Sequence, residues 1–370
     1  MTTWPSEPAS DHAAAAGAPA ANMWTPPAPS DLPEIDVVIP VYRPGPWLDA
    51  CLDSVLASEG VRARVWVVDD LPGDVRVHQA ARVRDGVRLI VSPRNLRYAA
   101  SVNLGIAAGS CEYVLLLNQD ARVDRSCLAL MARWFAEDRS LGSVGCRVLH
   151  QPSPDQPPDG LLDTVGIEMR RGRRAVDIGQ GEADDSRWRG RRRVFGVCAA
   201  VVLYRRDSLE RVARGREVMD PRFVMHKEDV DLAWRLQRAG FSAGVDGDGV
   251  AFHARGTARA ADSATNEGAP MAGRVRAILR QERQKSKMVR RLAWRNHLLL
   301  IIKNETAVGL RAQFRAIMAL QLGYLATGLL LDPWGTIAAR LAAVGPLVTA
   351  VADRRSWPPE TAVDISQWLE

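Results

Sequence analysis

Short apolar runs alternate with amphipathic stretches from residue 35 onward. Near-continuous apolar runs predict buried strands at residues 35–42, 64–70, 87–92, 112–120, 194–204 and 250–253. Apolar residues that recur at helical spacing predict helices at residues 47–58, 98–109, 126–138 and 228–239. Strands that are apolar on both faces and alternate with helices are typical of a parallel sheet covered on both sides. The pattern therefore predicts an α/β fold with a mostly parallel sheet.

The regions on either side of this pattern differ from it. Residues 1–33 consist mainly of Ala, Pro, Ser and Thr, and the first Lys or Arg is Arg43, which predicts a disordered leader rather than a signal peptide. The α/β unit then covers residues 34–258, a loop covers 259–269, and 270–370 reads as helical. No run reaches the roughly 18 continuous apolar residues of a membrane span. We expect the nearest candidate, residues 316–331, to be a packed or surface-lying helix.

Charge is concentrated in one segment of the C-terminal region. The chain has a formal net charge of +6, yet Arg274–Arg295 alone contains nine Lys or Arg and one acid, a net charge of +8. A basic segment favours an acidic partner, which is a membrane surface, a nucleic acid or a diphosphate. The five cysteines are odd in number and contain no C-x-x-C pair, which favours reduced thiols and a cytoplasmic location.

Polar side chains follow several of the predicted strands. Asp69 and Asp70 end the second strand, Asn95 follows the third, and Asn118 and Asp120 end the fourth. Ligands of open parallel sheets bind at the carboxyl ends of the strands, and oxygen ligands there suit a divalent cation that carries a diphosphate. The alternative is ordinary turn chemistry, in which Asn and Asp are common.

Two further positions have both a chemical and a structural interpretation. Glu228 and Asp229 begin a predicted helix, where carboxylates also serve as simple caps. His253 ends an apolar strand, where a lone histidine is more often structural than a ligand. The residues alone leave both alternatives open.

The order of these pieces resembles a known family. The segments VVIPVYRPGPWLDACLDSV, VVDD, RNLRYAASVNLGIAAG, LLLNQDARV and FVMHKEDVDLAWRLQRAGF occur in the same sequence as in the family-2 inverting glycosyltransferases of GT-A fold. The resemblance is to the rhamnosyltransferase-like bacterial branch and runs from about residue 34 to 258. It implies a GT-A fold followed by a C-terminal all-helical region.

The resemblance also implies roles for individual residues. Asp229 would be the catalytic base, and Glu228 beside it would hold a donor or acceptor hydroxyl. Asp120 and His253 would bind Mg²⁺ or Mn²⁺, and Asp69 or Asp70 would accept the N–H of uracil or thymine. The implied nucleotide-sugar contacts are Pro40, Tyr42, Asp69, Asp70, Asn95, Ser101, Asn103, Asn118, Gln119 and Asp120.

The chain departs from the family pattern at two places. The turn after the second strand is Asp70-Leu71-Pro72-Gly73-Asp74 instead of the family's Asn-Ser-x-x-Gly, which affects the implied ribose contacts. The family's glycine two residues after the Asn95 position is Arg97 here. This cation is either an additional phosphate contact or a solvent-facing side chain, and we expect the second.

The function implied by the resemblance is inverting transfer of a sugar from a nucleoside diphosphate to a hydroxyl group. The branch favours dTDP-rhamnose, with a UDP-hexose as the alternative donor, and the acceptor is a glycan, a polyprenyl-linked sugar or a small glycosylated metabolite. The C-terminal helices would contact an anionic membrane on its inner face, or form a homo-oligomer.

Three other functions fit the sequence less well. A sugar nucleotidyltransferase needs a Gly- and Arg-rich phosphate loop after the first strand, which VIPVYRPGPW lacks. A nucleic-acid-binding protein is disfavoured because Trp294 is the only aromatic residue of the basic segment, and no binding module is visible. A catalytically inactive scaffold is disfavoured because both Asp120 and Asp229 are present.

Overall fold

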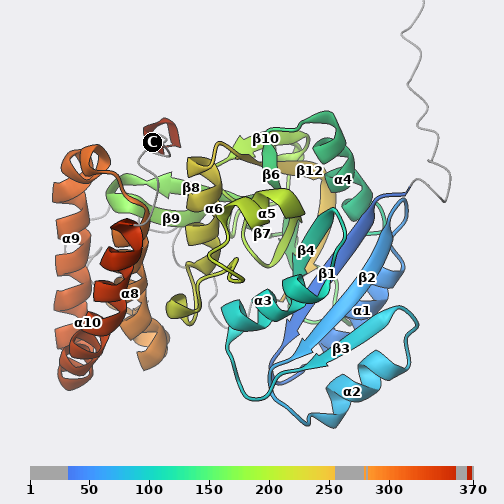
Figure 1. Cartoon of the computed structure of the whole chain (residues 1–370), viewed down its shortest axis with the longest axis horizontal. Coiled ribbons are helices and arrows are strands. Elements are labelled where there is room, and N and C mark those ends of the chain that lie inside the picture. The colour runs from blue at the N-terminus through green and yellow to red at the C-terminus, as the bar shows by residue number, and fades with distance from the viewer. Residues whose placement is uncertain (1–31, 255–278, 281, 356–364, 369–370) are drawn as a thin grey trace, which may run out of the picture.

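The structure is a computed structural model that describes residues 32–254, 279–280, 282–355 and 365–368. Most of the predicted leader over residues 1–33, and all of the predicted loop over 259–269, lie outside the described residues. The described part is a central sheet with helices on both faces and a bundle of long helices at one side (Figure 1).

A mixed sheet runs through the α/β part. Its strands are β1 (Glu34–Val41), β2 (Arg62–Asp69), β3 (Val87–Val91), β4 (Tyr113–Leu117), β5 (Ala121–Val123), β6 (Leu141–His150), β7 (Leu162–Thr164), β10 (Arg191–Val194), β11 (Val201–Arg205) and β12 (Ser242–His253). The strand order is β10-β12-β6-β11-β4-β1-β2-β3, with β5 paired to β12 and β7 paired to β6. Most paired residues are parallel, and β11 is inserted antiparallel between β4 and β6. A separate hairpin consists of β8 (Ile167–Arg170) and β9 (Arg174–Asp177).

Helices cover both faces of the sheet because successive strand residues point to opposite sides. Val37 and Ile39 of β1 pack with α1 (Trp47–Leu56), α2 (Val75–Arg82) and α4 (Cys127–Glu137). Val38 packs on the other face with α3 (Tyr98–Ala108), α5 (Arg206–Val212) and α6 (Glu228–Arg238). Short 3₁₀ turns occur at Arg171–Arg173, Ser186–Trp188, Pro221–Phe223 and Ile365–Trp368.

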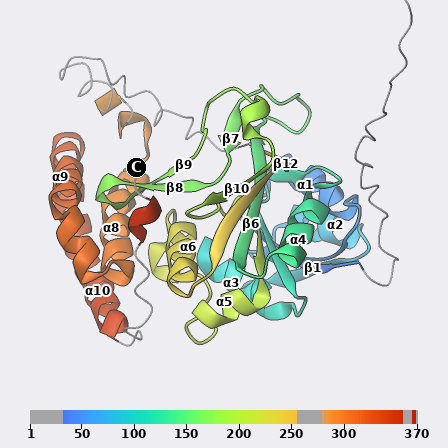
Figure 2. The same cartoon turned by 90° about the horizontal axis from the view of Figure 1, so that it is seen from above.

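The C-terminal region is helical, as predicted. It contains α8 (Lys287–Asn304), α9 (Ala307–Leu331) and α10 (Pro333–Arg355), which lie together beyond α6 and the β8–β9 hairpin (Figure 2). Leu299 and Leu300 of α8 pack in one apolar cluster with Trp234 of α6. A buried ion pair between Arg173 and Glu305 also joins the bundle to the hairpin region.

The predicted elements are confirmed in the first half of the chain, and one predicted strand is wrong. Residues 194–204 are the end of β10, an irregular segment and β11, rather than one strand. Phe195 and Val197 of the irregular segment enter two different apolar clusters, so their apolar character reflects burial and not strand pairing. The pattern also predicts no element over residues 139–193, where the structure contains β6, β7, β8, β9 and part of β10.

Two C-terminal helices are long and apolar enough, by length and composition alone, to cross a membrane. They are Ala307–Leu331 and Pro333–Arg354, each with a most apolar 18-residue window of mean hydropathy 1.5. Only 11% and 22% of these windows are buried. No continuous apolar run reaches 18 residues, as expected from the sequence, but the helices are longer than these runs, because in α9 Arg315 and Gln321 interrupt the apolar run without ending the helix.

Candidate active site

The carboxyl ends of β1 and β4 lie side by side and are linked by hydrogen bonds. The N–H of Tyr42 donates to Oε1 of Gln119 (3.0 Å), and Nε2 of Gln119 donates to the carbonyl of Tyr42 (3.2 Å). Pro40, near the end of β1, is in register with Val68 of the parallel strand β2. Three of the predicted nucleotide contacts, Pro40, Tyr42 and Gln119, therefore lie at one edge of the sheet.

Asp69 and Asp70 at the end of β2 are both buried, but their carboxylates have different partners. The two carboxylate oxygens of Asp70 accept the backbone N–H groups of Leu96 (2.6 Å) and Arg97 (2.9 Å). One oxygen of Asp69 accepts the N–H of Leu71 (3.0 Å), and the other, Oδ2, lies 3.5 Å from Nε2 of His78. Asp70 therefore fixes the segment before α3, whereas Asp69 faces Leu71 and His78.

Arg97 stands where the resembled family pattern has glycine, and its backbone conformation is one that favours glycine. Its φ of 73° and ψ of 167° lie in a region that glycine adopts readily and that is strained for other residues. The N–H of Arg97 also donates to Oδ1 of Asn95 (3.1 Å), so Asp70 and Asn95 together hold the strained turn. Arg97 is exposed, as expected from the sequence.

The two predicted contacts on α3 differ in burial, and Asn103 is only half-buried. Ser101 is fully buried, and its hydroxyl has no hydrogen-bond partner in the described part of the chain. The side chain of Asn103 accepts the N–H groups of Val218 and Met219 (3.1 and 2.9 Å) and donates to the carbonyl of Met219 (2.8 Å). Asn103 thus anchors the segment that leads to α6.

His253 lies between two carboxylates at the end of β12. Its Nδ1 is 2.8 Å from Oδ2 of Asp163, and its Nε2 is 3.3 Å from Oδ1 of Asp120 and 3.4 Å from Nδ2 of Asn118. Burial alone would lower the pKa of His253, but the hydrogen bonds and charges of Asp120 and Asp163 raise it to about 9. The structure therefore brings together the two residues that the sequence predicts as metal ligands.

The residues at this position fit a divalent cation. If Nδ1 of His253 donates to Asp163, its Nε2 lone pair faces an oxygen of Asp120, and either a proton or a cation must lie between these two acceptors. A carboxylate on the far ring nitrogen is the usual support of a metal-binding histidine. In the described segments, no three His, Cys, Asp or Glu side chains are arranged to enclose an ion. A cation here would therefore take its remaining ligands from a diphosphate and water.

The first residues of α6 face the segment between β10 and β11. Asp229 accepts the N–H of Val230 through Oδ1 (2.8 Å) and the N–H of Ala199 through Oδ2 (3.4 Å). The carbonyl of Ala199 in turn accepts the hydroxyl of Tyr98 (3.1 Å). Burial, followed by the charges of Glu228 and Asp229, raises the pKa of Tyr98 well above its ordinary value.

One short segment connects the acidic helix start with the candidate metal ligands. Ala199 contacts Asp229, and the carbonyl of the next residue, Ala200, accepts the N–H of Asn118 (2.9 Å). Asn118 is the residue whose amide lies beside His253. The acids of α6 and the polar end of β4 therefore lie on two sides of the same loop.

Glu228 has an unusual environment for a carboxyl group. It is 9% exposed, and its Oε2 has no hydrogen-bond partner in the described part of the molecule. Burial is the main cause that raises its pKa to about 8, and the neighbouring charge of Asp229 adds to this. The group therefore keeps its proton at neutral pH and can donate a hydrogen bond.

Sequence reasoning missed two residues of this site. Asp163 lies on the short strand β7 in the polar region after residue 150, where no pattern distinguishes it from loop acids. Tyr98 is the first residue of α3, within the family-like segment, but its hydroxyl donates to the carbonyl of Ala199, 101 residues away. Both contacts depend on long-range packing.

A comparison with known protein families agrees with this arrangement. Residues 36–212 match the model of glycosyl transferase family 2. The match covers β1 to α5, including Asp69, Asn118 and Asp120. It confirms the family resemblance for this part of the chain.

Individual relatives are similar over limited lengths. Succinoglycan biosynthesis protein ExoO of Rhizobium meliloti (strain 1021) is 33% identical over 99 residues, which are 26% of this chain and 28% of that protein. An N-acetylglucosaminyltransferase of Rhizobium sp. (strain N33) is 30% identical over 187 residues, which are 49% and 39% of the two chains. The matches thus span well under half of these relatives.

A solved structure shows the same fold. The structure of GalNAc-T7 with UDP, GalNAc and Mn²⁺ matches with a TM-score of 0.51 at 11% identity, covering 74% of this chain and 48% of that one. At this identity the likeness concerns the fold alone. The fold is GT-A, as the sequence predicts.

Proposed function

We propose that this chain, which carries a glycosyl transferase family 2 region over residues 36–212, is an inverting glycosyltransferase that uses a nucleoside diphosphate sugar. One observation carries the proposal. The Asp120–His253 pair and the Glu228–Asp229 helix start lie on two sides of the Ala199–Ala200 segment. Sugar transfer needs these two groups together, since a cation stabilises the departing diphosphate and a base activates the acceptor.

The reaction is a single displacement at the anomeric carbon of the donor. Asp229 takes the proton from the acceptor hydroxyl as its oxygen attacks, and the nucleoside diphosphate leaves from the opposite face. Glu228, which keeps its proton at neutral pH, donates a hydrogen bond to a sugar hydroxyl. The Ala199 N–H orients the Asp229 carboxylate, and α6 holds both acids at its first turn.

Asp120 and His253 would hold Mg²⁺ or Mn²⁺ in this reaction. When bound, the cation neutralises charge on the departing diphosphate. Asp163 fixes the ring of His253 so that Nε2 faces Asp120. The nucleotide base lies near Asp69, with Tyr42 and Gln119 at the same edge of the sheet.

The donor we favour is dTDP-rhamnose, and a UDP-hexose is the alternative. The resemblance of the five motifs to the rhamnosyltransferase-like branch supports the first. The acceptor is a hydroxyl group of a glycan, a polyprenyl-linked sugar or a small glycosylated metabolite. The printed name of one relative, a succinoglycan biosynthesis protein, fits a role in polysaccharide synthesis.

We assign the catalytic work to residues 34–258 and a docking role to the helical region over 270–370. The enzyme would work in the cytoplasm, attached to the inner face of the membrane through α9 and α10. The exposed apolar residues of these helices, here called the outer face, include Phe314, Met318, Leu322, Leu329, Leu330, Trp334, Ile337, Leu341, Val344 and Val348. Between residues 307 and 352, the charged residues exposed are Arg311 and Arg315, both basic.

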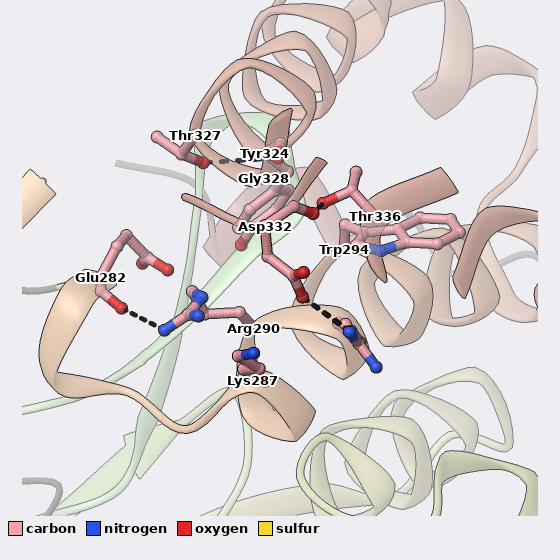
Figure 3. Close-up of a pocket in the computed structure, with 10 residues that line it drawn as sticks. Glu282, Lys287, Arg290, Trp294, Tyr324, Thr327, Gly328, Asp332 and Thr336 are labelled. Atoms are coloured by element: carbon pink, nitrogen blue, oxygen red, sulfur yellow. Dashed lines mark hydrogen bonds and ion pairs between the residues drawn. The ribbon is translucent and has the colours of Figure 1, made fainter. Parts of the chain in front are cut away.

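Basic side chains also lie beside the other end of the outer face. Figure 3 shows a pocket between α8, α9 and the start of α10 to which Lys287 and Arg290 contribute. Arg291, which also lines the pocket, pairs with Asp332 (2.7 Å). An apolar face with cations at both ends matches an anionic bilayer, in which apolar side chains enter the interface and cations meet headgroups.

Vesicle flotation tests this attachment. We expect the protein to float with phosphatidylglycerol vesicles more than with phosphatidylcholine vesicles, and less at high salt. Leu341→Glu should abolish flotation, while Val83→Glu, at an equally exposed site on the catalytic part, should not. If Leu341→Glu instead dissociates a dimer and leaves flotation unchanged, a second copy of the chain covers the outer face and the membrane assignment is wrong.

A donor screen tests the enzymatic proposal. Nucleoside diphosphate sugars are incubated with the full chain and Mg²⁺ or Mn²⁺, and the release of UDP or dTDP is measured. We expect release with one sugar class, loss with chelator, and loss in Asp120→Asn. The matched control is Asp124→Asn, which alters an exposed carboxylate four residues away. Release from no donor, or full release in chelator, would contradict the proposal.

A further inference from the structure

The loop before the proposed base has a strained backbone. Val224, His226 and Lys227 all have positive φ angles, of 64°, 65° and 74°, although none is glycine. Each such residue is held against its backbone preference and persists only where the surroundings fix it. Glu228 and Asp229 follow immediately, so the direction in which these acids point depends on this loop.

Two neighbouring residues of α8 bind this loop through its carbonyl groups. Nδ2 of Asn296 donates to the carbonyls of Phe223 (2.8 Å), Met225 (2.7 Å) and His226 (2.8 Å). Nη2 of Arg295 donates to the carbonyl of Phe223 (2.9 Å) and to Oδ1 of Asn296 (2.7 Å). Asn296 is 1% exposed. Both polar atoms of its amide, Nδ2 and Oδ1, have hydrogen-bond partners.

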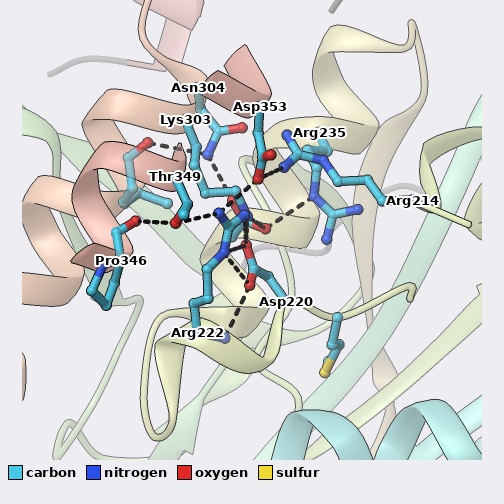
Figure 4. Close-up of polar contacts among 12 residues, drawn as sticks. Arg214, Asp220, Arg222, Arg235, Lys303, Asn304, Pro346, Thr349 and Asp353 are labelled. Atoms are coloured by element: carbon cyan, nitrogen blue, oxygen red, sulfur yellow. Dashed lines mark hydrogen bonds and ion pairs between the residues drawn. The ribbon is translucent and has the colours of Figure 1, made fainter. Parts of the chain in front are cut away.

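The same helix, α8, also forms hydrogen bonds with the segments on either side of the loop (Figure 4). Lys303, also 1% exposed, donates to Oδ2 of Asp220 before the loop (2.5 Å) and to Oδ2 of Asp231 in the first turn of α6 (2.8 Å). Asn304 donates to the other oxygen of Asp231 (2.8 Å). Burial raises the pKa of Asp231, but the charge of Lys303, followed by that of Arg235, outweighs this and lowers it.

We infer that Asn296 is a positioning residue of the active site, supported by Arg295, and that it holds the strained loop so that Asp229 faces the acceptor. The inference rests on the proposed function, because it assigns Asp229 the role of base. It also gives α8, which lies outside the family-matched residues 36–212, a part in catalysis. The active site of the GT-A part then depends on α8 for the position of its base.

Three variants of the full chain separate positioning from general stability. Asn296→Ala removes the amide, and Asn296→Asp keeps its shape but replaces the donor with an acceptor. Leu299→Ala is the matched control, since it removes buried apolar atoms from the same helix, in the cluster that contains Phe223, without removing a hydrogen bond to the loop. All three are compared with wild type at a temperature where circular dichroism shows each variant folded.

Two readouts are measured on each variant. Steady-state kinetics should show kcat lower by about tenfold or more in both Asn296 variants, with the KM for donor changed by less than about threefold. Hydrogen exchange of the 222–228 peptide should be faster in both Asn296 variants. The Leu299→Ala variant should keep the kcat and the exchange rate of the wild type.

The outcomes are distinct. Unchanged exchange over 222–228 in Asn296→Ala overturns the inference, and so does an equal loss of kcat in Leu299→Ala. If the wild-type protein transfers no sugar, the proposed function fails, and the exchange comparison alone still decides whether Asn296 holds the loop.

Discussion

Acidification should weaken the attachment of the helical bundle through one buried histidine. His297 of α8 is fully buried, with Nε2 2.8 Å from the carbonyl of Gly172 and Nδ1 2.7 Å from Nε2 of Gln321. These partners require a neutral ring, because Nε2 donates to the carbonyl and Nδ1 accepts from the amide. Burial is the main cause that lowers the pKa of His297 from 6.5 to about 4, and the charge of Lys227 adds to it.

The sign and size of the effect follow from linkage. Below pH 6.5 the unfolded chain binds a proton at His297, whereas the folded protein does not bind it until about pH 4. The free energy of unfolding therefore falls as the pH falls from 6.5 to about 4. The full difference corresponds to about 3 kcal/mol, since each unit of pKa is about 1.4 kcal/mol. Between pH 7 and pH 5 the loss is about 2 kcal/mol.

Urea unfolding of wild type and His297→Gln at pH 7 and pH 5 measures this loss. Glutamine keeps an N–H donor for Gly172 but has no proton to gain, and the titration of carboxylates is common to both proteins. We expect the free energy of unfolding to fall by about 2 kcal/mol more in wild type than in the variant. An equal fall in the two proteins would refute the reasoning.

Three further predictions concern packing, the metal site and Glu228. Gly105→Ala should lower the free energy of unfolding by about 1–3 kcal/mol, because its Cβ would lie 2.3 Å from Cγ1 of Val38; Gly323→Ala, with no atom within 4 Å, is the control in the same melting experiment. Asp163→Asn should raise the metal concentration for half-maximal activity about 10- to 100-fold, and an unchanged metal titration would remove Asp163 from the site. Glu228→Gln should raise the melting temperature at pH 8 but not at pH 4.5. The pKa of Glu228 is raised to about 8 in the folded protein, so between these pH values the unfolded chain releases a proton that the folded protein keeps, and this destabilises the wild type alone. An equal shift of the melting temperature at both pH values would contradict this.

The α/β part could be predicted because its signals are local. The strands β1, β2 and β4 are continuous apolar runs, and α1, α3 and α4 have helical spacing, so each element is encoded within its own residues. The pairing of Asp120 with His253 was found only through the family resemblance, because 133 residues separate them and spacing alone leaves the histidine structural.

The rest of the site depends on contacts that no local pattern records. Asp163 meets His253 across 90 residues, and Asn296 meets the loop at 223–226 across at least 70. The charge of the basic segment predicts an acidic partner, yet Arg295 within it donates to backbone carbonyls of the catalytic part. Composition gives the charge of such a residue, and only packing gives its partner.

The most direct test of the account compares Asp229→Asn with wild type in sugar transfer and in donor binding. The substitution keeps the shape of the side chain and removes the base, so the rate of transfer should fall about 10²- to 10⁴-fold. The dissociation constant of the donor, measured with metal by calorimetry, should stay within about threefold of wild type, because Asp229 acts on the acceptor. Transfer within threefold of the wild-type rate would contradict the account and make Glu228 the candidate base.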